Sequence, residues 1–170
     1  VETKKDDSPV TKADLDAHNV LVGGLAQLTP HIAIVSEEDP ASLEVPQQNN
    51  CYWLIDPLDG TKEFINRNGE FTVNLALIED NRPSLGFVST PVDKTLYWGG
   101  KQLGSWRLRD SSLEPLQTQA SHNPIRVVAS KSHLNEDTRD FITSLGDTQL
   151  IQAGSSLKLL RIAEGSADVY

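Results

Sequence analysis

The amino-acid sequence predicts a layered fold of the α/β (α+β) class, in which an antiparallel-sheet subdomain is followed by a mixed-sheet subdomain. Two patterns support this prediction. Between residues 71 and 109, short apolar stretches follow one another at hairpin spacing, which is typical of an antiparallel meander. Beyond residue 124, expected strands and helices alternate, which favours parallel or mixed pairing. We expect an α+β metal-binding subdomain over residues 1–114 and an incomplete α/β subdomain over residues 115–170.

The first expected helix has a clear start and a clear end. Residues 1–10 are polar and predict an extended lead-in. Thr11 and Asp14 fit a capping box, which predicts that a helix opens there. The pair Gly23-Gly24 weakens the middle of this helix, and Thr29-Pro30 ends it.

A central stretch follows a short strand and a loop. Residues 32–35 predict a buried strand that leads into the acidic cluster of residues 36–40, and residues 41–50 predict a mobile loop. Apolar residues around Trp53 then predict a second buried strand, which Pro57 is expected to end.

The remaining elements are short. Thr61 is a good N-cap for a helix over residues 62–66. Polar residues 110–124 predict a linker between the subdomains. Further strands are expected at residues 71–78, 85–90, 95–98, 104–109, 125–129, 149–152 and 167–170, and helices at residues 135–145 and 156–164.

Composition limits the classes of function. The chain has 170 residues with 38% hydrophobic and 23% charged residues, which is typical of a globular protein. A net charge of −9 argues against a nucleic-acid scaffold, and no stretch approaches the length of a membrane span. The single cysteine, Cys51, is expected to be a small core residue and suits the cytosol. The chain starts at Val1 and stops at Tyr170 inside an expected strand, as a fragment would.

The central stretch combines carboxylates with a helix start. Asp56 and Asp59 leave the strand three residues apart, next to Gly60, which tolerates backbone angles that other residues avoid. Oxygen ligands without a Cys/His pairing favour Mg²⁺, and the amides of Gly60 and Thr61 would suit a phosphate. The sequence therefore predicts a joint metal and phosphate site. The alternative is a strand-turn-helix corner whose aspartates cap backbone amides.

Other polar residues keep simpler interpretations beside the functional ones. Asp14 could serve only in the capping box, and the acidic residues 36–40 could be a solvated turn. His18 lies on the apolar helix face, where a hydrogen-bonded core histidine is more common than a ligand. His122 and His133 have no partner at metal-ligand spacing, and no Gly-x-Ser-x-Gly stretch supports a serine hydrolase.

A series of motifs runs in order along nearly the whole chain: Asp7-Ser8-Pro9-Val10-Thr11-x-Ala13-Asp14, Ser36-Glu37-Glu38-Asp39-Pro40, Trp53-x-Ile55-Asp56-Pro57-Leu58-Asp59-Gly60-Thr61-Lys62-Glu63-Phe64, Asn68-Gly69-Glu70-Phe71-Thr72-Val73-Asn74 and Gly154-Ser155-Ser156-Leu157-Lys158. These motifs resemble those of the inositol monophosphatase superfamily of Mg²⁺-dependent, lithium-sensitive phosphatases. Within it, they most resemble the CysQ-type 3′(2′),5′-bisphosphate nucleotidases. The resemblance implies the layered αβαβ(α) sandwich of the inositol monophosphatase and sugar phosphatase type.

The resemblance also implies a role for each matching residue. Two or three Mg²⁺ ions would be bound, with Li⁺ as an inhibitor. Glu37, Asp56 and the Leu58 carbonyl would hold the first metal, and Asp56 and Asp59 the second. Thr61, oriented by Asp14, would help Glu37 and the first metal to activate the attacking water. The substrate would contact Asp59, Gly60 and Thr61 through its phosphate and Ser132, His133, Ser156 and Lys158 through its nucleoside.

The chain departs from the family pattern at both ends. It lacks the family's N-terminal helix and its Trp-Asp-x-Ala-Ala block, whose aspartate completes the second metal site. Since Mg²⁺ prefers several fixed oxygen ligands, low activity of this chain by itself is expected.

The function implied is removal of the 3′-phosphate from adenosine 3′,5′-bisphosphate, a by-product of sulfate assimilation, to give AMP. Alternative substrates are inositol monophosphate and other sugar phosphates, and the alternative class is a non-catalytic module that binds a metal, a nucleotide or a partner protein. The expected partner is a small phosphate ester rather than a nucleic-acid polymer, with the oligomeric state open. The expected location is the cytoplasm, or the inner face of the cell membrane as a peripheral protein.

Overall fold

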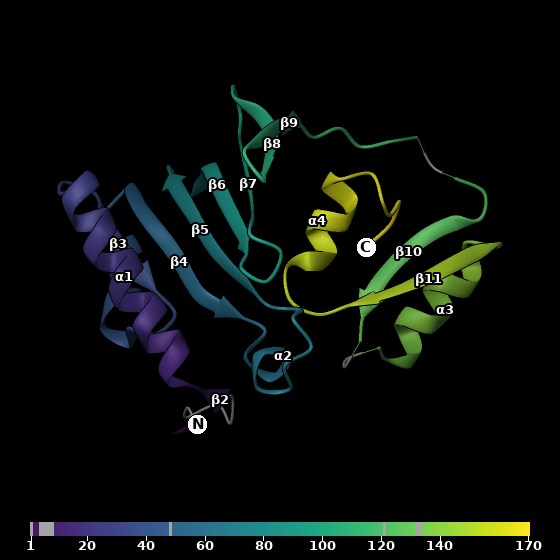
Figure 1. Cartoon of the computed structure of the whole chain (residues 1–170), viewed down its shortest axis with the longest axis horizontal. Coiled ribbons are helices and arrows are strands. Elements are labelled where there is room, and N and C mark those ends of the chain that lie inside the picture. Colours follow the sequence, from purple (N-terminus) through teal and green to yellow (C-terminus); the bar gives the residue numbers. More distant parts are fainter. Residues whose placement is uncertain (1, 4–8, 48, 121, 132–133) are drawn as a thin grey trace. The chain divides into compact units, whose positions relative to one another are not determined.

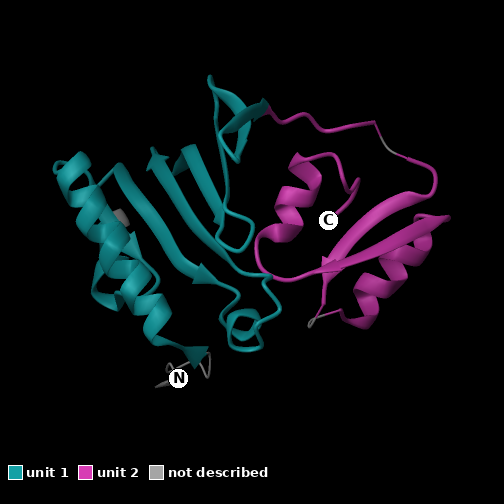
Figure 2. Cartoon of the chain, in the orientation of Figure 1, with its two compact units in different colours: residues 1–114 teal, residues 115–170 magenta. Residues whose placement is uncertain are grey.

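The computed structural model describes residues 2–3, 9–47, 49–120, 122–131 and 134–170. The chain divides into two compact units, Val1–Glu114 and Pro115–Tyr170 (Figure 2). The first unit carries a large sheet, and the second carries a small sheet and helices of its own. None of the helices in the described ranges is long and apolar enough to cross a membrane.

Strands and helices of both units are labelled in Figure 1. The first unit contains β1 (Glu2–Thr3), β2 (Pro9–Val10), α1 (Lys12–Leu28), β3 (Ala33–Ser36), the 3₁₀ helix η1 (Pro40–Gln47), β4 (Cys51–Asp59), α2 (Thr61–Ile65), β5 (Thr72–Glu79), β6 (Arg82–Thr90), β7 (Thr95–Gly100), β8 (Gly104–Arg109) and β9 (Ser112–Pro115). The second contains β10 (Ile125–Ser130), α3 (Glu136–Ser144), β11 (Thr148–Ala153) and α4 (Leu157–Ala163). This mixture of helices and sheets confirms the predicted fold class.

One sheet forms the body of the first unit, with strands in the order β3-β4-β5-β6-β7-β8-β9. β3 and β4 run parallel, whereas the four pairs from β4–β5 to β7–β8 are antiparallel. Strands that follow one another in sequence thus lie side by side, which confirms the predicted meander. The parallel pair β3–β4 brings the carboxyl ends of two strands to one edge of the sheet.

The apolar core is organised around β4. Trp53 and Ile55 pack with Leu25 of α1, whereas Tyr52 belongs to a separate cluster with Val35. Because successive residues of a strand face opposite sides, β4 serves a core on each face of the sheet. Helix α1 covers one of these faces (Figure 1).

Helix α1 begins as the sequence predicts. The Thr11 side chain accepts from the Ala13 amide at 3.1 Å, and the Thr11 amide donates to Asp14 Oδ2 at 2.8 Å. The capping box is therefore confirmed. The helix continues through Gly23-Gly24 to Leu28, because the packing of residues such as Leu25 on the sheet outweighs the low helix propensity of glycine.

Three expected elements differ from the prediction. Residues 40–47 form the helix η1 instead of a loop, because Ser42 Oγ donates to the Asp39 carbonyl at 2.6 Å and stabilises a local turn. The expected linker contains β9, reached through a tight turn at Asp110 and Ser111, both at positive φ. Glycine or asparagine is usual at such positions, so the pair Asp110-Ser111 does not predict a turn of this type. The expected last strand is reduced to a single bridge between Val127 and Val169.

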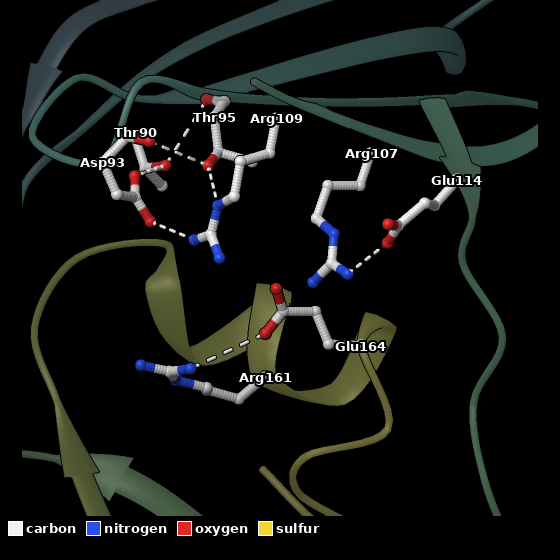
Figure 3. A network of polar contacts seen from close by, with 8 residues as sticks. All are labelled: Thr90, Asp93, Thr95, Arg107, Arg109, Glu114, Arg161 and Glu164. Atoms are coloured by element: carbon white, nitrogen blue, oxygen red, sulfur yellow. Dashed lines mark hydrogen bonds and ion pairs between the residues drawn. The ribbon is translucent and has the colours of Figure 1, made fainter. Parts of the chain in front are cut away.

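A polar network fixes the turn between β6 and β7 (Figure 3). The Thr90 hydroxyl donates to the Asp93 carboxylate. Arg109 of β8 donates from Nη2 to Asp93 Oδ2 at 2.7 Å and from Nε to Thr95 Oγ1 at 2.8 Å. One arginine therefore ties β8 to the neighbouring turn.

In the second unit, β10 and β11 pair in parallel, as predicted. Val128, Ala153 and Ala167 form its core. Arg126 and Asp168 form an ion pair beside this core: Arg126 Nη2 lies 2.9 Å from Asp168 Oδ1, and only 3% of the Asp168 side chain is exposed. The hydrogen bonds from Arg126 hold the pKa of Asp168 well below its usual range.

Replacing Asp168 by Asn should lower the thermal stability of the second unit, because Arg126 would lose its charged partner while staying mostly buried. Since the folded-state pKa of Asp168 is depressed below 3.8, the carboxylate stabilises the fold above that pH, and the stabilisation is lost as pH falls. Melting curves should therefore differ most above pH 3.8 and approach each other as the pH falls below that value towards the depressed pKa of the folded state. Asp16→Asn, which breaks the exposed pair with Lys12, is the control and should change little. A difference as large in acid as at neutral pH would contradict this account.

Candidate active site

The parallel pair β3–β4 places carboxylates from two chain segments together. Ser36 at the end of β3 lies opposite Ile55 of β4. The amide of the next residue, Glu37, donates to the Ile55 carbonyl at 3.1 Å. Glu37 and Asp56 therefore lie side by side, since each directly follows one member of the pair Ser36–Ile55. Their carboxyl groups interact through a side-chain hydrogen bond.

A bulge in β4 carries the strand past Pro57. Asp56 pairs with Asn74 of β5 and Asp59 pairs with Thr72, so two residues of β4 lie opposite Val73 alone. The prediction that Pro57 ends the strand is wrong, because a bulge tolerates a residue without an amide hydrogen. In a regular strand, residues three apart face opposite sides, so the extra residue is what lets Asp56 and Asp59 act on the same space. The charge of Asp59 does act on Asp56.

Thr61 has a different role from the predicted helix cap. Gly60 is the residue before α2, at φ 95° and ψ 44°, and Thr61 is the first helical residue. The Thr61 hydroxyl donates to Asp14 Oδ1 at 3.1 Å, with the Leu58 carbonyl 3.4 Å away as a second acceptor. Gly60 takes the left-handed conformation that a side chain would oppose, and this turn aims the Thr61 hydroxyl at α1.

Asp14 is the buried link between these segments. None of Asp14 is exposed to solvent. One oxygen accepts from the Thr11 amide at 2.8 Å and the Thr11 hydroxyl at 2.6 Å, and the other accepts from Thr61. Asp14 thus belongs to the capping box and also contacts Thr61, so it does more than cap the helix, and its catalytic role stays a prediction.

Burial and neighbouring carboxylates shift the pKa of Asp56. Burial, followed by the charges of Glu37 and Asp59, raises the pKa of Asp56 from 3.8 to about 7. The Leu58 amide donates to Asp56 Oδ1 at 3.2 Å and opposes part of this shift. A site with this charge would gain from a bound cation.

The donor set at this edge consists of oxygens only, which fits a hard cation such as Mg²⁺. Within the described ranges, no group of three or more His, Cys, Asp or Glu side chains is arranged as a ready metal site. The assignment of Glu37, Asp56, Asp59 and the Leu58 carbonyl as metal ligands therefore stays a prediction.

The expected nucleoside contacts lie in the second unit. Lys158 Nζ donates to the Ser155 carbonyl at 2.6 Å and lies 5.7 Å from the centre of the Tyr170 ring. Ser156 precedes α4 as its N-cap residue. Ser132 and His133 lie outside the described residues, and the roles given to all four remain predictions.

Two histidines and the cysteine have simple surroundings. His18 Nδ1 lies 2.7 Å from Ser36 Oγ, so it is hydrogen-bonded, as the simpler interpretation expects. His122 lies 3.3 Å from Asp168. Cys51 is only partly buried at the start of β4, which corrects its expected core position.

Two contacts at the acidic segments have no signal in the sequence. Ser36 is held by His18, and Thr72 Oγ1 lies 3.5 Å from Asp59 Oδ2. Both partners come from other elements, so no spacing in the sequence points to them.

A cavity of about 720 Å³ borders α2. Phe64, Phe71 and Val92 form apolar walls, and Thr11, which binds Asp14, also lines it. The rings of Phe64 and Phe71 meet edge to face with centres 5.1 Å apart. The space beside α2 is therefore of a size that accommodates small ligands.

Comparison with known proteins identifies a family. The model of the inositol monophosphatase family matches residues 1–170. The chain is 48% identical over 167 residues to the 3′(2′),5′-bisphosphate nucleotidase CysQ of Salmonella typhimurium, covering 98% of this chain and 67% of that protein. It is 45% identical over 170 residues to the CysQ of Escherichia coli, covering 100% of this chain and 68% of that protein. The chain thus spans about two thirds of the length of these relatives.

Solved structures agree with the family model. The crystal structure of CysQ from Bacteroides thetaiotaomicron matches with a TM-score of 0.81 and 36% identity, over 97% of this chain and 67% of that one. An inositol monophosphatase from Thermotoga maritima matches with a TM-score of 0.78 and 22% identity, over 98% of this chain and 65% of that one, which supports the fold.

Replacing Asp56 by Asn should stabilise the metal-free chain at high pH. Because the folded-state pKa of Asp56 is raised to about 7, the folded chain binds a proton more tightly than the unfolded chain, and stability is lost as pH rises from 3.8 to about 7. Above that range we expect the variant to gain on the order of 1–2 kcal/mol in free energy of unfolding, discounted for partial exposure. Urea unfolding with a chelator present, across this pH range, measures it. The exposed Asp140→Asn is the control, and an unchanged pH profile for Asp56→Asn would refute the assigned pKa.

Proposed function

The chain belongs to the inositol monophosphatase family, and from this premise we propose that it is a Mg²⁺-dependent phosphatase that removes the 3′-phosphate of 3′(2′),5′-bisphosphate nucleotides. The observation that supports the proposal most strongly is the position of Asp56: burial, and after it the charges of Glu37 and Asp59, raise the pKa of Asp56 to about 7. A buried carboxylate that interacts with two other carboxylates would be stabilised by a divalent cation.

The metal ligands would come from the edge formed by β3 and β4. Glu37, Asp56 and the Leu58 carbonyl would hold one Mg²⁺, and Asp56 and Asp59 a second. When bound, the ions would supply a nucleophilic water at neutral pH and neutralise charge on the phosphate. Li⁺ is expected to inhibit by competing at this site.

Thr61 and Glu37 would handle the proton of the attacking water. The Thr61 hydroxyl hydrogen is directed to Asp14 Oδ1, so the lone pairs of Thr61 Oγ1 remain to accept a hydrogen bond from water. Glu37 would then take the proton, as a carboxylate whose own amide is held on β4. Asp14 is a positioning residue in this scheme, since it is buried and contacts Thr61 rather than the reactants.

The phosphate would be bound at the start of α2. The first amides of a helix have no carbonyl partner within it, and here the first such bond runs from the Phe64 amide to the Gly60 carbonyl. The amides of Gly60 and Thr61 are therefore the proposed phosphate donors, with Asp59 beside them.

The names of the relatives suggest a specific substrate. We place adenosine 3′,5′-bisphosphate first because the Salmonella typhimurium and Escherichia coli relatives are named 3′(2′),5′-bisphosphate nucleotidases. Ser156 and Lys158, together with Ser132 and His133, would face the nucleoside. A cytoplasmic location is proposed with this substrate.

A non-catalytic binding module is the competing candidate. One observation favours it: the described residues contain no group of three or more side chains arranged as a ready metal site. A chain of this kind would bind a nucleotide or a single metal without turnover.

Phosphate release from adenosine 3′,5′-bisphosphate, with and without Mg²⁺, tests the proposal. We expect release that depends on Mg²⁺, and a loss of at least about 100-fold in Asp59→Asn because a metal ligand is removed. Asp16→Asn, on the exposed face of α1, is the matched control and should behave as the wild type. Inositol monophosphate is assayed alongside. Nucleotide binding without any release would favour the binding module.

Thr61→Val should lower kcat by roughly 100-fold or more while KM changes little, because the hydroxyl contacts the attacking water and not the bound substrate. Thr61→Ser keeps the hydroxyl and should retain most of the activity. Steady-state kinetics of the two variants measure the difference. A loss in Thr61→Ser as large as that in Thr61→Val would contradict the role of the hydroxyl, because the serine variant keeps that group.

A further inference from the structure

We propose that His18 is a positioning residue for the acidic turn that follows β3, residues 36–40. By its hydrogen bond to Ser36, His18 keeps the Glu37 carboxylate facing Asp56. The inference deepens the proposed function and rests on it, because that function makes Glu37 a metal ligand and proton acceptor. The sequence alone favoured a core histidine here, and the contacts of Ser36 give the residue a more specific role.

His18 satisfies a buried hydroxyl. Its Nδ1 lies 2.7 Å from Ser36 Oγ, and Ser36 is only 1% exposed. The same oxygen accepts from the Glu38 amide at 3.3 Å. A hydroxyl has one hydrogen, so the arrangement is complete when Ser36 donates to Nδ1 and the His18 proton sits on Nε2. Among the residues that the structure describes, no other group accepts this hydrogen.

Hydrogen bonds of Ser36 fix the conformation of the acidic turn. Its amide donates to Ser42 Oγ at 3.0 Å, and its carbonyl accepts from the Asp39 amide at 3.1 Å. Glu37 lies between two fixed amides: its own donates to the Ile55 carbonyl of β4, and that of Glu38 donates to Ser36 Oγ. A rotation of the Ser36 hydroxyl group would release the second of these amides and change the direction of Glu37.

Helix α1 supports both halves of the site from one face. Asp14 and His18 are four residues apart, so their side chains lie one turn from each other on the same side of the helix. Asp14 holds Thr61 of α2, and His18 holds Ser36 at the end of β3. One turn of α1 thus sets the distance between the proposed water-activating hydroxyl and the proposed base.

A purely structural histidine would behave differently, and the chain offers a matched control. Trp53 Nε1 donates to Thr29 Oγ1 at 2.9 Å, a bond that joins the other end of α1 to β4. Loss of that bond should lower the thermal stability of the protein without changing the conformation of the acidic turn. His18 and Thr29 therefore separate an effect on the site from an effect on the packing of α1.

The experiment compares His18→Leu, His18→Asn and Thr29→Val in two measurements, after thermal melting has established folding. Calorimetric titration gives Mg²⁺ affinity, and amide hydrogen exchange by NMR reports on Glu38. In His18→Leu we expect Mg²⁺ to bind about 10-fold more weakly, because losing a group that orients a metal ligand typically lowers metal affinity by this amount. We also expect the Glu38 amide hydrogen to exchange faster. His18→Asn, whose side-chain oxygen can reach the position of Nδ1, should recover most of both. Thr29→Val should melt earlier with Mg²⁺ affinity within about 2-fold of the wild type.

Each outcome decides the proposal. Unchanged affinity and exchange in His18→Leu, or a failure of His18→Asn to improve on it, would overturn the role of His18. If His18→Leu does not fold, Ser36→Ala removes the same bond from the other side and is expected to give the same losses. If the wild type binds no Mg²⁺, the proposed function fails, and the exchange of Glu38 still decides whether His18 holds the turn. In the active protein, the His18→Leu defect should appear in kcat more than in KM.

Discussion

The site depends on one buried carboxylate, Asp14, which accepts hydrogen bonds from the helix start before it and from the turn after β4. Its burial is complete, and a carboxylate without hydrogen bonds would be costly in such a place. The Thr11 amide and hydroxyl and the Thr61 hydroxyl meet that need. A change at any of these groups would therefore disturb α1 and α2 together. The capping box is part of the proposed active site as well as part of the helix.

Electrostatics and stability oppose each other at the edge formed by β3 and β4. Burial of Asp56, followed by the charges of Glu37 and Asp59, raises the pKa of Asp56 to about 7. The fold tolerates this because the backbone on both strands is fixed by parallel pairing and by the bulge at Pro57. An arrangement that costs stability without a cation is typical of functional sites, where local consistency is sacrificed for chemistry.

The two units use charge in opposite ways. In the second unit, Asp168 is paired with Arg126 and its pKa falls, so the carboxylate stabilises the fold by itself. In the first unit, Asp56 is largely buried and interacts with two other carboxylates, and both effects raise its pKa. The two pKa values shift in opposite directions because the surroundings of the two carboxylates differ, which composition and net charge do not reveal.

Sequence by itself determined the elements and the residue types of the candidate site. The capping box at Thr11 follows from contacts between residues a few positions apart, and the meander and the parallel strands of the second unit follow from the order and spacing of apolar stretches; the structure confirms all three. The carboxylates were also found from the sequence, since they follow expected strands. What the tertiary structure decided is how these residues meet. The bulge at Pro57, the donation from Thr61 to Asp14 across 47 positions and the support of Ser36 by His18 depend on packing between distant segments. Local patterns do not record such contacts, because each partner would be equally acceptable in its own segment without the other.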